Sequence, residues 1–195
     1  MTRVRLEKEE RKKQIKEVAL QLFIEKGLVR TVMDDIIEKS GISKGGVYYH
    51  YKNKEEIFTD LIKDSMALRK KLVISYISNN KDMRREDLII NMLLDKILDK
   101  NPYKTIYAIF LSELSTNKTL MDLYHRIYQE SKEEFVQFCI SENLPEYIPL
   151  TNEECDFFIN SMIMGRAMLE HGDETKVRDM LKVMLIAYLK QRSIL

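Results

Sequence analysis

Side chains suited to contacting a polyanion gather in one short segment near the N-terminus. They supply a hydroxyl, two ammonium groups, backbone without a side chain, and a run of phenol and imidazole donors. Such groups donate to phosphate oxygens, and a lysine can also reach a guanine edge. The segment comprises Ser43, Lys44, Gly45, Tyr48, Tyr49, His50 and Lys54. This pattern favours nucleic-acid contacts.

The rest of the sequence offers no constellation typical of an enzyme. The three histidines lie far apart, and no zinc-protease, phosphate-loop, nucleophile-elbow or dinucleotide motif is found. Cys139 and Cys155 lack the spacing of a zinc site, although with His125 they could gather around a metal. We therefore expect no enzyme, no resident metal and no cofactor, and metal sensing stays open as an alternative.

Composition points to helices. The chain has 195 residues, 45% apolar and 32% charged, with six glycines, three prolines and no tryptophan. This scarcity of turn formers argues against an all-β protein, and two cysteines give no disulfide framework. No apolar run is long enough for a membrane span and the N-terminus lacks a signal-peptide core, so we expect no membrane and a cytoplasmic location.

Charge is distributed unevenly. Residues 1–54 carry 13 basic and 8 acidic side chains, whereas the remaining 141 residues carry 19 and 23. A basic quarter on a mildly acidic body suits contact with a polyanion at one end, although such a segment can also be a solvated face.

The elements that must position these residues can be predicted from periodicity and caps. Apolar residues repeat at helical spacing over 15–23, and Gly27 ends that helix in a left-handed conformation. Thr31 is expected to cap a short second helix that ends at Ser40-Gly41, and Ser43 to cap a third through Tyr49. Further helices are expected at 53–79, 84–100, 102–115, 118–142, 152–171 and 173–192.

Helix boundaries rest on a few local signals. Asn53 with Glu56 begins the fourth helix, and Asn101 precedes Pro102 at the start of another. Thr151 with Glu154 forms a capping box, Gly172 separates the last two helices, and Asn143–Leu150 is a loop. No alternation typical of a strand persists. The sequence therefore predicts an all-α fold.

A short helix, a tight turn at Gly41 and a second short helix form a helix-turn-helix. The second helix would offer its N-terminal end to base edges in the major groove, and its free N–H groups favour phosphate. Val47 and Tyr51 are expected in the core, as are Ile36 and Ile57. The arm with Arg3, Arg5 and Lys8 is either a solvated tail or a minor-groove contact.

The pattern from Gly27 to Ile57 resembles the N-terminal signature of the tetracycline-repressor (TetR) family of transcriptional regulators. The matching residues include Thr31, Ser40-Gly41-Ile42-Ser43-Lys44-Gly45, Tyr48-Tyr49-His50-Tyr51 and Lys54-Glu55. The resemblance implies about nine helices in a dimer, with a DNA-binding domain at 1–52 and a ligand-binding and dimerisation domain at 53–195. It also implies operator contacts by Thr31, Ser43, Lys44, Tyr48, Tyr49, His50 and Lys54. Gly46 departs from the family, which often has a larger residue there.

A helix-turn-helix binds weakly alone, so we expect a homodimer on a palindromic double-stranded operator. The last two helices are the expected interface, with Phe158, Met162, Gly165, Leu169, Val177, Leu181, Met184 and Tyr188 on their facing sides. The alternative is that these stripes pack within their own subunit.

Aromatic residues between 103 and 158 could line an apolar cavity for a small-molecule effector. The expected lining is Tyr103, Tyr107, Phe110, Glu113, Tyr124, His125 and Tyr128, with Arg126 nearby. An apolar or aromatic effector would shift the conformational population and release DNA. The sequence thus predicts a ligand-responsive repressor. A ligand-independent or metal-sensing regulator, and a helical interaction protein without DNA binding, are the alternatives.

Overall fold

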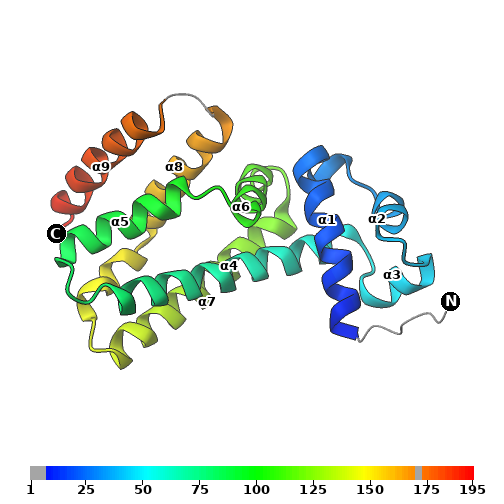
Figure 1. Cartoon of the computed structure of the whole chain (residues 1–195), viewed down its shortest axis with the longest axis horizontal. Coiled ribbons are helices and arrows are strands. Elements are labelled where there is room, and N and C mark those ends of the chain that lie inside the picture. The colour runs from blue at the N-terminus through cyan, green and yellow to red at the C-terminus, as the bar shows by residue number, and fades with distance from the viewer. Residues whose placement is uncertain (1–7, 170–172) are drawn as a thin grey trace. The chain divides into compact units, whose positions relative to one another are not determined.

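A computed structural model describes residues 8–169 and 173–195, and these residues fold into α-helices and one 3-10 helix without a strand (Figure 1). The all-α fold class is therefore confirmed for the described ranges. The helices are α1 (Lys8–Arg30), α2 (Met33–Ser40), α3 (Lys44–His50), α4 (Lys54–Asn79), α5 (Arg85–Leu98), α6 (Pro102–Glu113), α7 (Lys118–Ser141), the 3-10 helix η1 (Pro145–Thr151), α8 (Glu153–Leu169) and α9 (Glu174–Gln191).

The chain divides into two compact units. The first contains the residues up to Ser65 and also Asn101–Phe110, and the second contains Met66–Lys100 and Leu111–Leu195. Helices α4 and α6 therefore each contribute residues to both units. The functional boundary expected between residues 52 and 53 remains a prediction.

The first unit is organised around the buried side of α1. Ile15, Ala19 and Phe23 are fully buried at helical spacing, and the Phe23 ring meets Phe58 of α4 edge-on with centroids 5.3 Å apart. Helix α2 packs on α1 and α3 packs on α2. Burial of such side chains supplies about 1.5–3 kcal/mol each, so the short α2 and α3 are held by packing rather than by their own helix propensity.

Gly27 interrupts α1 in a way that the sequence predicted only in part. Its φ of 79° is positive, as expected, but its ψ of 163° lies outside the left-handed helical region. That combination is accessible essentially to glycine alone. The chain is redirected there and continues through Leu28, which is buried, to Arg30.

The second unit is centred on α5, whose inner side is almost continuously apolar. Seven of its residues are buried, and it packs against both α8 and α9, while η1 packs against α7 and α8 (Figure 1). Because α5 is covered on two sides, its sequence has a wide apolar face rather than a narrow stripe. The buried residues are Leu88, Ile89, Ile90, Met92, Leu93, Leu94 and Ile97.

The predicted helix boundaries hold to within a few residues, with two corrections. The backbone N–H of Glu56 donates to Asn53 and that of Lys104 donates to Asn101, as expected. The α8 cap, however, is Asn152, which accepts from Cys155 N–H at 2.7 Å, so the predicted Thr151 capping box is wrong. The Thr151 hydroxyl instead donates backward to Ile148 O at 2.8 Å.

The segment 143–150 was expected to be a loop, but Pro145–Thr151 forms η1. A proline at the start of this turn fixes a helical φ, and the buried Tyr147 anchors it. The expectations for Arg3, Arg5 and Gly172 lie outside the described residues.

Candidate nucleic-acid interface

The turn between α2 and α3 takes only three residues. Gly41 adopts the left-handed conformation (φ 65°, ψ 13°) that ends α2, and its N–H donates to Glu38 O. Ile42 is buried beneath the turn, and the Ser43 hydroxyl accepts from Gly46 N–H at 3.3 Å. The predicted turn and the predicted Ser43 cap are both present. They leave the first N–H groups of α3 at the surface.

Burial of Val47 determines which side of α3 faces outward. Val47 is fully buried, whereas Tyr48 and Tyr49 retain 41% and 75% of their surface exposed. Lys44 and Gly45 are exposed as well. The exposed part of α3 thus combines an ammonium group, two phenols and a bare backbone, which is the donor set expected from the sequence.

Lys44 is held only by weak surface contacts. Its ammonium lies 3.6 Å from the carboxylate of Asp34 and 6.0 Å from the centre of the Tyr48 ring. Exposed ion pairs of this kind contribute between zero and about 1 kcal/mol. A phosphate or a base edge can therefore compete for this side chain.

The two glycines after Lys44 have different environments. A Cβ on Gly45 would meet open space, so the backbone there can approach a ligand. A Cβ on Gly46 would lie 2.8 Å from a methyl group of Ile42 and 3.1 Å from the Ser43 hydroxyl. Close packing of the turn against α3 therefore leaves no room for a Cβ at position 46 unless Ile42 shifts.

His50 lies at the end of α3 and is half-buried. Its Nδ1 is shielded from solvent and has no hydrogen-bond partner, and its ring meets Tyr49 edge-on at 5.0 Å. Burial lowers the pKa of His50, and the nearby Lys12 and Lys8 ammonium groups lower it further. The imidazole is consequently neutral near pH 7, and its phosphate contact remains a prediction.

Cations at the start of α1 extend this surface beyond the residues that the sequence singled out. Lys8 lies 6.0 Å from the Tyr49 ring centre, and Lys12 lies 5.5 Å from that of Tyr51. Lys12 and Arg11 also act on His50 electrostatically. Sequence reasoning missed Arg11 and Lys12. Basic residues that recur every three to four positions along α1 lie on one side of the helix, and this spacing could have identified them.

The expected role of Thr31 is wrong. Thr31 is fully buried, and its hydroxyl donates to Gly27 O at 2.8 Å and lies 3.3 Å from Leu22 O. Residue Val32 occupies the cap position of α2, and its N–H donates to the Asp35 carboxylate at 3.1 Å. Thr31 therefore holds the end of α1 and presents no side chain to a ligand.

Lys54 also has a different setting from the one expected. Its ammonium donates to three backbone carbonyls, those of Leu28 at 2.8 Å, Val29 at 3.0 Å and Thr31 at 2.8 Å. These are carbonyls at and just beyond the end of α1, where a helix leaves acceptors without partners. The Lys54 cation therefore caps α1 rather than standing free for phosphate.

Comparison with known proteins decides the family. Residues 15–61 match the model of bacterial regulatory proteins of the tetR family. The chain belongs to this family. The HTH-type transcriptional regulator YfiR of Bacillus subtilis is 40% identical over 65 residues, which cover 32% of each chain. The negative regulator IcaR of the biofilm operon of Staphylococcus epidermidis is 52% identical over 40 residues, which cover 20% of this chain and 22% of IcaR. The TetR-family chain thus spans less than a third of either relative's length.

Similarity to a solved structure extends much further. A transcriptional regulator of the TerR/AcrR family from Aquifex aeolicus is 26% identical, and the match covers 91% of this chain and 99% of that one with a TM-score of 0.64. The solved structure of Salmonella enterica GusR, 16% identical with a TM-score of 0.63, has the same fold. The TetR-family fold therefore extends over most of the chain.

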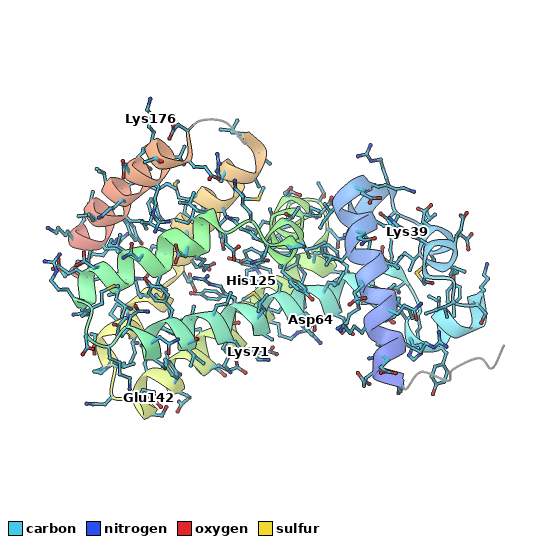
Figure 2. All side chains as sticks on the ribbon, in the orientation of Figure 1. Lys39, Asp64, Lys71, His125, Glu142 and Lys176 are labelled. Atoms are coloured by element: carbon cyan, nitrogen blue, oxygen red, sulfur yellow. The ribbon has the colours of Figure 1, made fainter. Side chains whose placement is uncertain are left out.

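The residues expected to line an effector cavity fall into both units of this TetR-family chain. Tyr103 and Tyr107 belong to the first unit together with Phe110, which is fully buried against Phe58 with ring centres 6.3 Å apart. Phe110 is thus a core residue. In the second unit, Glu113 is half-buried and His125 is exposed (labelled in Figure 2).

Tyr124 and Tyr128 have partners in the second unit. The Tyr124 phenol donates to the carboxylate of Asp156, which also accepts from Asn160 at 2.9 Å. Tyr128 stacks on Tyr124 with centres 6.4 Å apart and donates to Thr151 O at 2.9 Å. Burial is the main cause that raises the pKa of both phenols. They are neutral donors in a polar network among the helices.

The second unit contains a pocket of about 620 Å³ whose lining differs from the expected one. It lies among α4, α5 and the start of α9, and none of the seven expected residues lines it. Its walls combine apolar side chains with charged groups of both signs. The lining residues are Arg69, Leu72, Val73, Tyr76, Met92, Asp95, Leu98, Asp99, Lys100, Glu174, Thr175 and Arg178.

The expected dimerisation residues divide into two groups. Phe158 and Tyr188 stack on each other at 4.5 Å and Leu181 is buried, so these three pack within the unit. Met162, Gly165 and Val177 are half-buried. Leu169 and Met184 are exposed, as an interface requires. Other exposed apolar side chains lie beside them on α8 and α9: Phe157, Met168, Met180 and Val183.

Within the described residues, no group of three or more histidine, cysteine, aspartate or glutamate side chains is placed to hold a metal ion. Cys139 and Cys155 are free and buried, and burial raises the pKa of both thiols, that of Cys139 to about 11. His125 is exposed and does not form a metal-binding group with them. No described helix combines the length and the hydropathy of a membrane span.

Proposed function

We propose that this TetR-family chain is a transcriptional repressor that binds a palindromic operator as a homodimer and is released by a small effector. The observation that supports DNA binding is the exposed side of α3. A buried Val47 holds the helix in place, while Lys44, Gly45, Tyr48 and Tyr49 remain available. The names of the relatives, which are transcriptional regulators, agree with this function.

DNA binding can be tested without knowing the operator. Selection from randomised duplexes should enrich an inverted repeat whose half-sites are about one helical turn, ~34–36 Å, apart. Lys44→Ala should relax the preference at one position of each half-site, at a cost of about 1–3 kcal/mol. Lys63→Ala is the control, because Lys63 is exposed on α4 and away from α3 in sequence. Failure to enrich any sequence, or enrichment without inverted symmetry, would contradict the proposal.

The homodimer is supported by the exposed apolar side of α8 and α9. Phe157 retains 74% and Val183 68% of its surface exposed, with four more apolar residues on the same two helices. Monomeric soluble proteins rarely leave so many large apolar side chains together in water. Two copies of this helix pair would bury them in a four-helix bundle across a two-fold axis.

Light scattering on eluted protein tests the dimer. Phe157→Lys combined with Val183→Lys should convert it to a monomer, since each buried lysine would lack a partner charge. Ile140→Lys is the matched control, because Ile140 is equally apolar and exposed but lies on α7. A double variant that remains dimeric would show that another surface forms the interface.

A further inference from the structure

The pocket of the second unit contains a guanidinium group without a carboxylate partner. Arg69 lines the pocket, and one of its Nη atoms donates to Met92 O at 3.0 Å. Its Nε is shielded from solvent and has no hydrogen-bond partner. Among the described residues no carboxylate lies within 4.0 Å of it. Buried N–H donors are usually hydrogen-bonded, so this half-buried side chain has one donor left unsatisfied.

The other two basic side chains of the pocket are already paired. Arg178 lies 3.4 Å from the carboxylate of Asp95, and Lys100 pairs with Glu174. In these ion pairs the charges of Asp95 and Glu174 are balanced by Arg178 and Lys100. The third carboxylate of the lining, Asp99, attracts the Arg69 guanidinium, but Arg69 Nε remains without a hydrogen-bond partner.

The electrostatic surroundings of Arg69 confirm that its charge is costly. Burial lowers the pKa of Arg69 to about 10, and the attraction of Asp99 and Asp95 does not compensate for it. Lys96, one turn from Met92 on α5, is a second, half-buried cation; burial lowers its pKa, Asp156 raises it, and Arg69 lowers it. Two neighbouring cations that destabilise each other would both be stabilised by an anion.

The remaining walls are apolar. Leu72 and Val73 of α4 and Met92 and Leu98 of α5 line the same pocket. A volume of about 620 Å³ lies in the usual range for small-molecule sites. The ligand must therefore combine an acidic group with an apolar body.

We propose that this pocket binds a small amphipathic organic anion, whose carboxylate accepts hydrogen bonds from the Arg69 guanidinium and whose apolar body lies along Leu72, Val73 and Leu98. A planar guanidinium suits a carboxylate because two parallel N–H donors meet two oxygens. This assigns a charged ligand, in place of the apolar or aromatic effector expected from the sequence. It depends on the proposed function in one respect: the anion acts as the effector.

Calorimetric titration of the full chain tests the site without DNA. The probes are benzoate, 4-phenylbutyrate, hexanoate and octanoate, their primary amides, and inorganic phosphate. The carboxylates should bind and the uncharged amides should bind about 10- to 100-fold more weakly, as expected for loss of a charge-assisted hydrogen bond. Arg69→Gln should reduce carboxylate affinity by a similar factor, and Arg69→Lys should restore part of it.

Two further variants keep the test independent of folding defects. Leu72→Glu adds an anion at an exposed position of the pocket and should weaken carboxylates but not amides. Lys71→Gln removes the same charge as Arg69→Gln from an exposed site on α4 (labelled in Figure 2) and should change nothing. Equal affinity for acids and amides, carboxylate binding unchanged by Arg69→Gln and Leu72→Glu, or no binding by any carboxylate would each overturn the site. Phosphate binding as tight as any carboxylate would overturn the amphipathic ligand.

The effector role is tested separately, on operator DNA obtained by selection. The tightest carboxylate should lower the DNA affinity of the unmodified chain but not that of Arg69→Gln. If the anion binds and DNA affinity is unchanged, the effector assignment is wrong although the site stands. If the chain does not bind DNA at all, the proposed function fails, and calorimetry still decides the site.

Discussion

Replacing Lys54 distinguishes a structural cap from a DNA contact. Its ammonium donates to three carbonyls at 2.8–3.0 Å, from residues 23 to 26 positions earlier in the chain. Lys54→Met keeps the aliphatic stem and removes all three bonds. A hydrogen bond to a charged group contributes about 1.5–3 kcal/mol when measured alone. Because one ammonium serves all three acceptors, and the exposed Val29 carbonyl can be rehydrated, we expect a loss of about 2–4 kcal/mol in total.

Urea unfolding of the full chain, followed by hydrogen exchange of the peptide around residues 28–40, measures this loss. The unfolding midpoint should fall, and amides near the end of α1 should exchange faster. Lys54→Arg should recover only part of the stability, since a planar fork cannot direct three donors at converging carbonyls as an ammonium does. Lys63→Met is the control, because Lys63 is exposed on the same helix.

A pure phosphate contact would give the opposite result. Lys54→Met would then unfold at the same urea concentration as Lys63→Met. It would instead reduce the slope of log affinity against log salt by about 0.9. That pair of outcomes would refute the capping role.

Three smaller perturbations test the same unit. Gly46→Ala should lower the free energy of unfolding by about 1–3 kcal/mol through overpacking, whereas Gly45→Ala should raise it by up to about 1 kcal/mol. Urea unfolding measures both changes. Equal effects of the two substitutions would contradict the packing described for Gly46. Thr31→Val should lower the free energy of unfolding by about 1–2 kcal/mol, because it leaves buried carbonyls without a donor. The DNA affinity of each folded molecule should not change. A variant that is as stable as the unmodified chain but binds DNA more weakly would show that Thr31 contacts DNA after all. Since the pKa of His50 is lowered, the unfolded chain binds its proton first, so stability should fall as pH drops below 6.5. In unfolding experiments at several pH values, His50→Gln should reduce this loss of stability, whereas His125→Gln, at an exposed site, should not. If the two variants lose stability equally as the pH drops, His50 is not the cause.

The helix-turn-helix could be predicted from sequence because its determinants are local. Gly41 needs a positive φ, Ser43 caps its own helix three residues on, and Val47 must be apolar to hold α3. Each of these requirements involves residues within one turn of each other. Residue type and spacing are therefore sufficient information for them.

The errors concern contacts between residues far apart in sequence. Thr31 has the right residue type for a cap, but it is buried, and its hydroxyl donates to Gly27 O, four residues earlier, and lies 3.3 Å from Leu22 O, nine residues earlier. Lys54 has the right charge for phosphate, but the carbonyls that accept its hydrogen bonds precede the helix-turn-helix in sequence, up to 26 residues before Lys54. The burial of Thr31 and the distant carbonyl partners of Lys54 are not marked by residue type, so sequence reasoning assigned both residues to DNA.

Periodicity has a related limit on α8 and α9. An apolar stripe shows that a helix face avoids water, but not whether its partner is the same subunit or another one. Phe158 and Leu181 pack within the unit, whereas Phe157 and Val183, each near in sequence, remain exposed. A wide apolar face contains both kinds of position, and a shift of one residue moves the inferred interface.

Two buried polar atoms without partners link the DNA-contacting surface and the pocket. In the described residues, His50 Nδ1 and Arg69 Nε are shielded from solvent and have no hydrogen-bond partner. Each such atom costs about 1–3 kcal/mol when no partner or water reaches it, so a stable chain tolerates few of them. The first lies at the end of α3, and the second belongs to a side chain that lines the pocket. If binding of DNA and of an organic anion lets these two side chains gain partners, each complex regains part of that free energy. Binding at both sites would then be favoured by the same deficit that makes the isolated chain less stable.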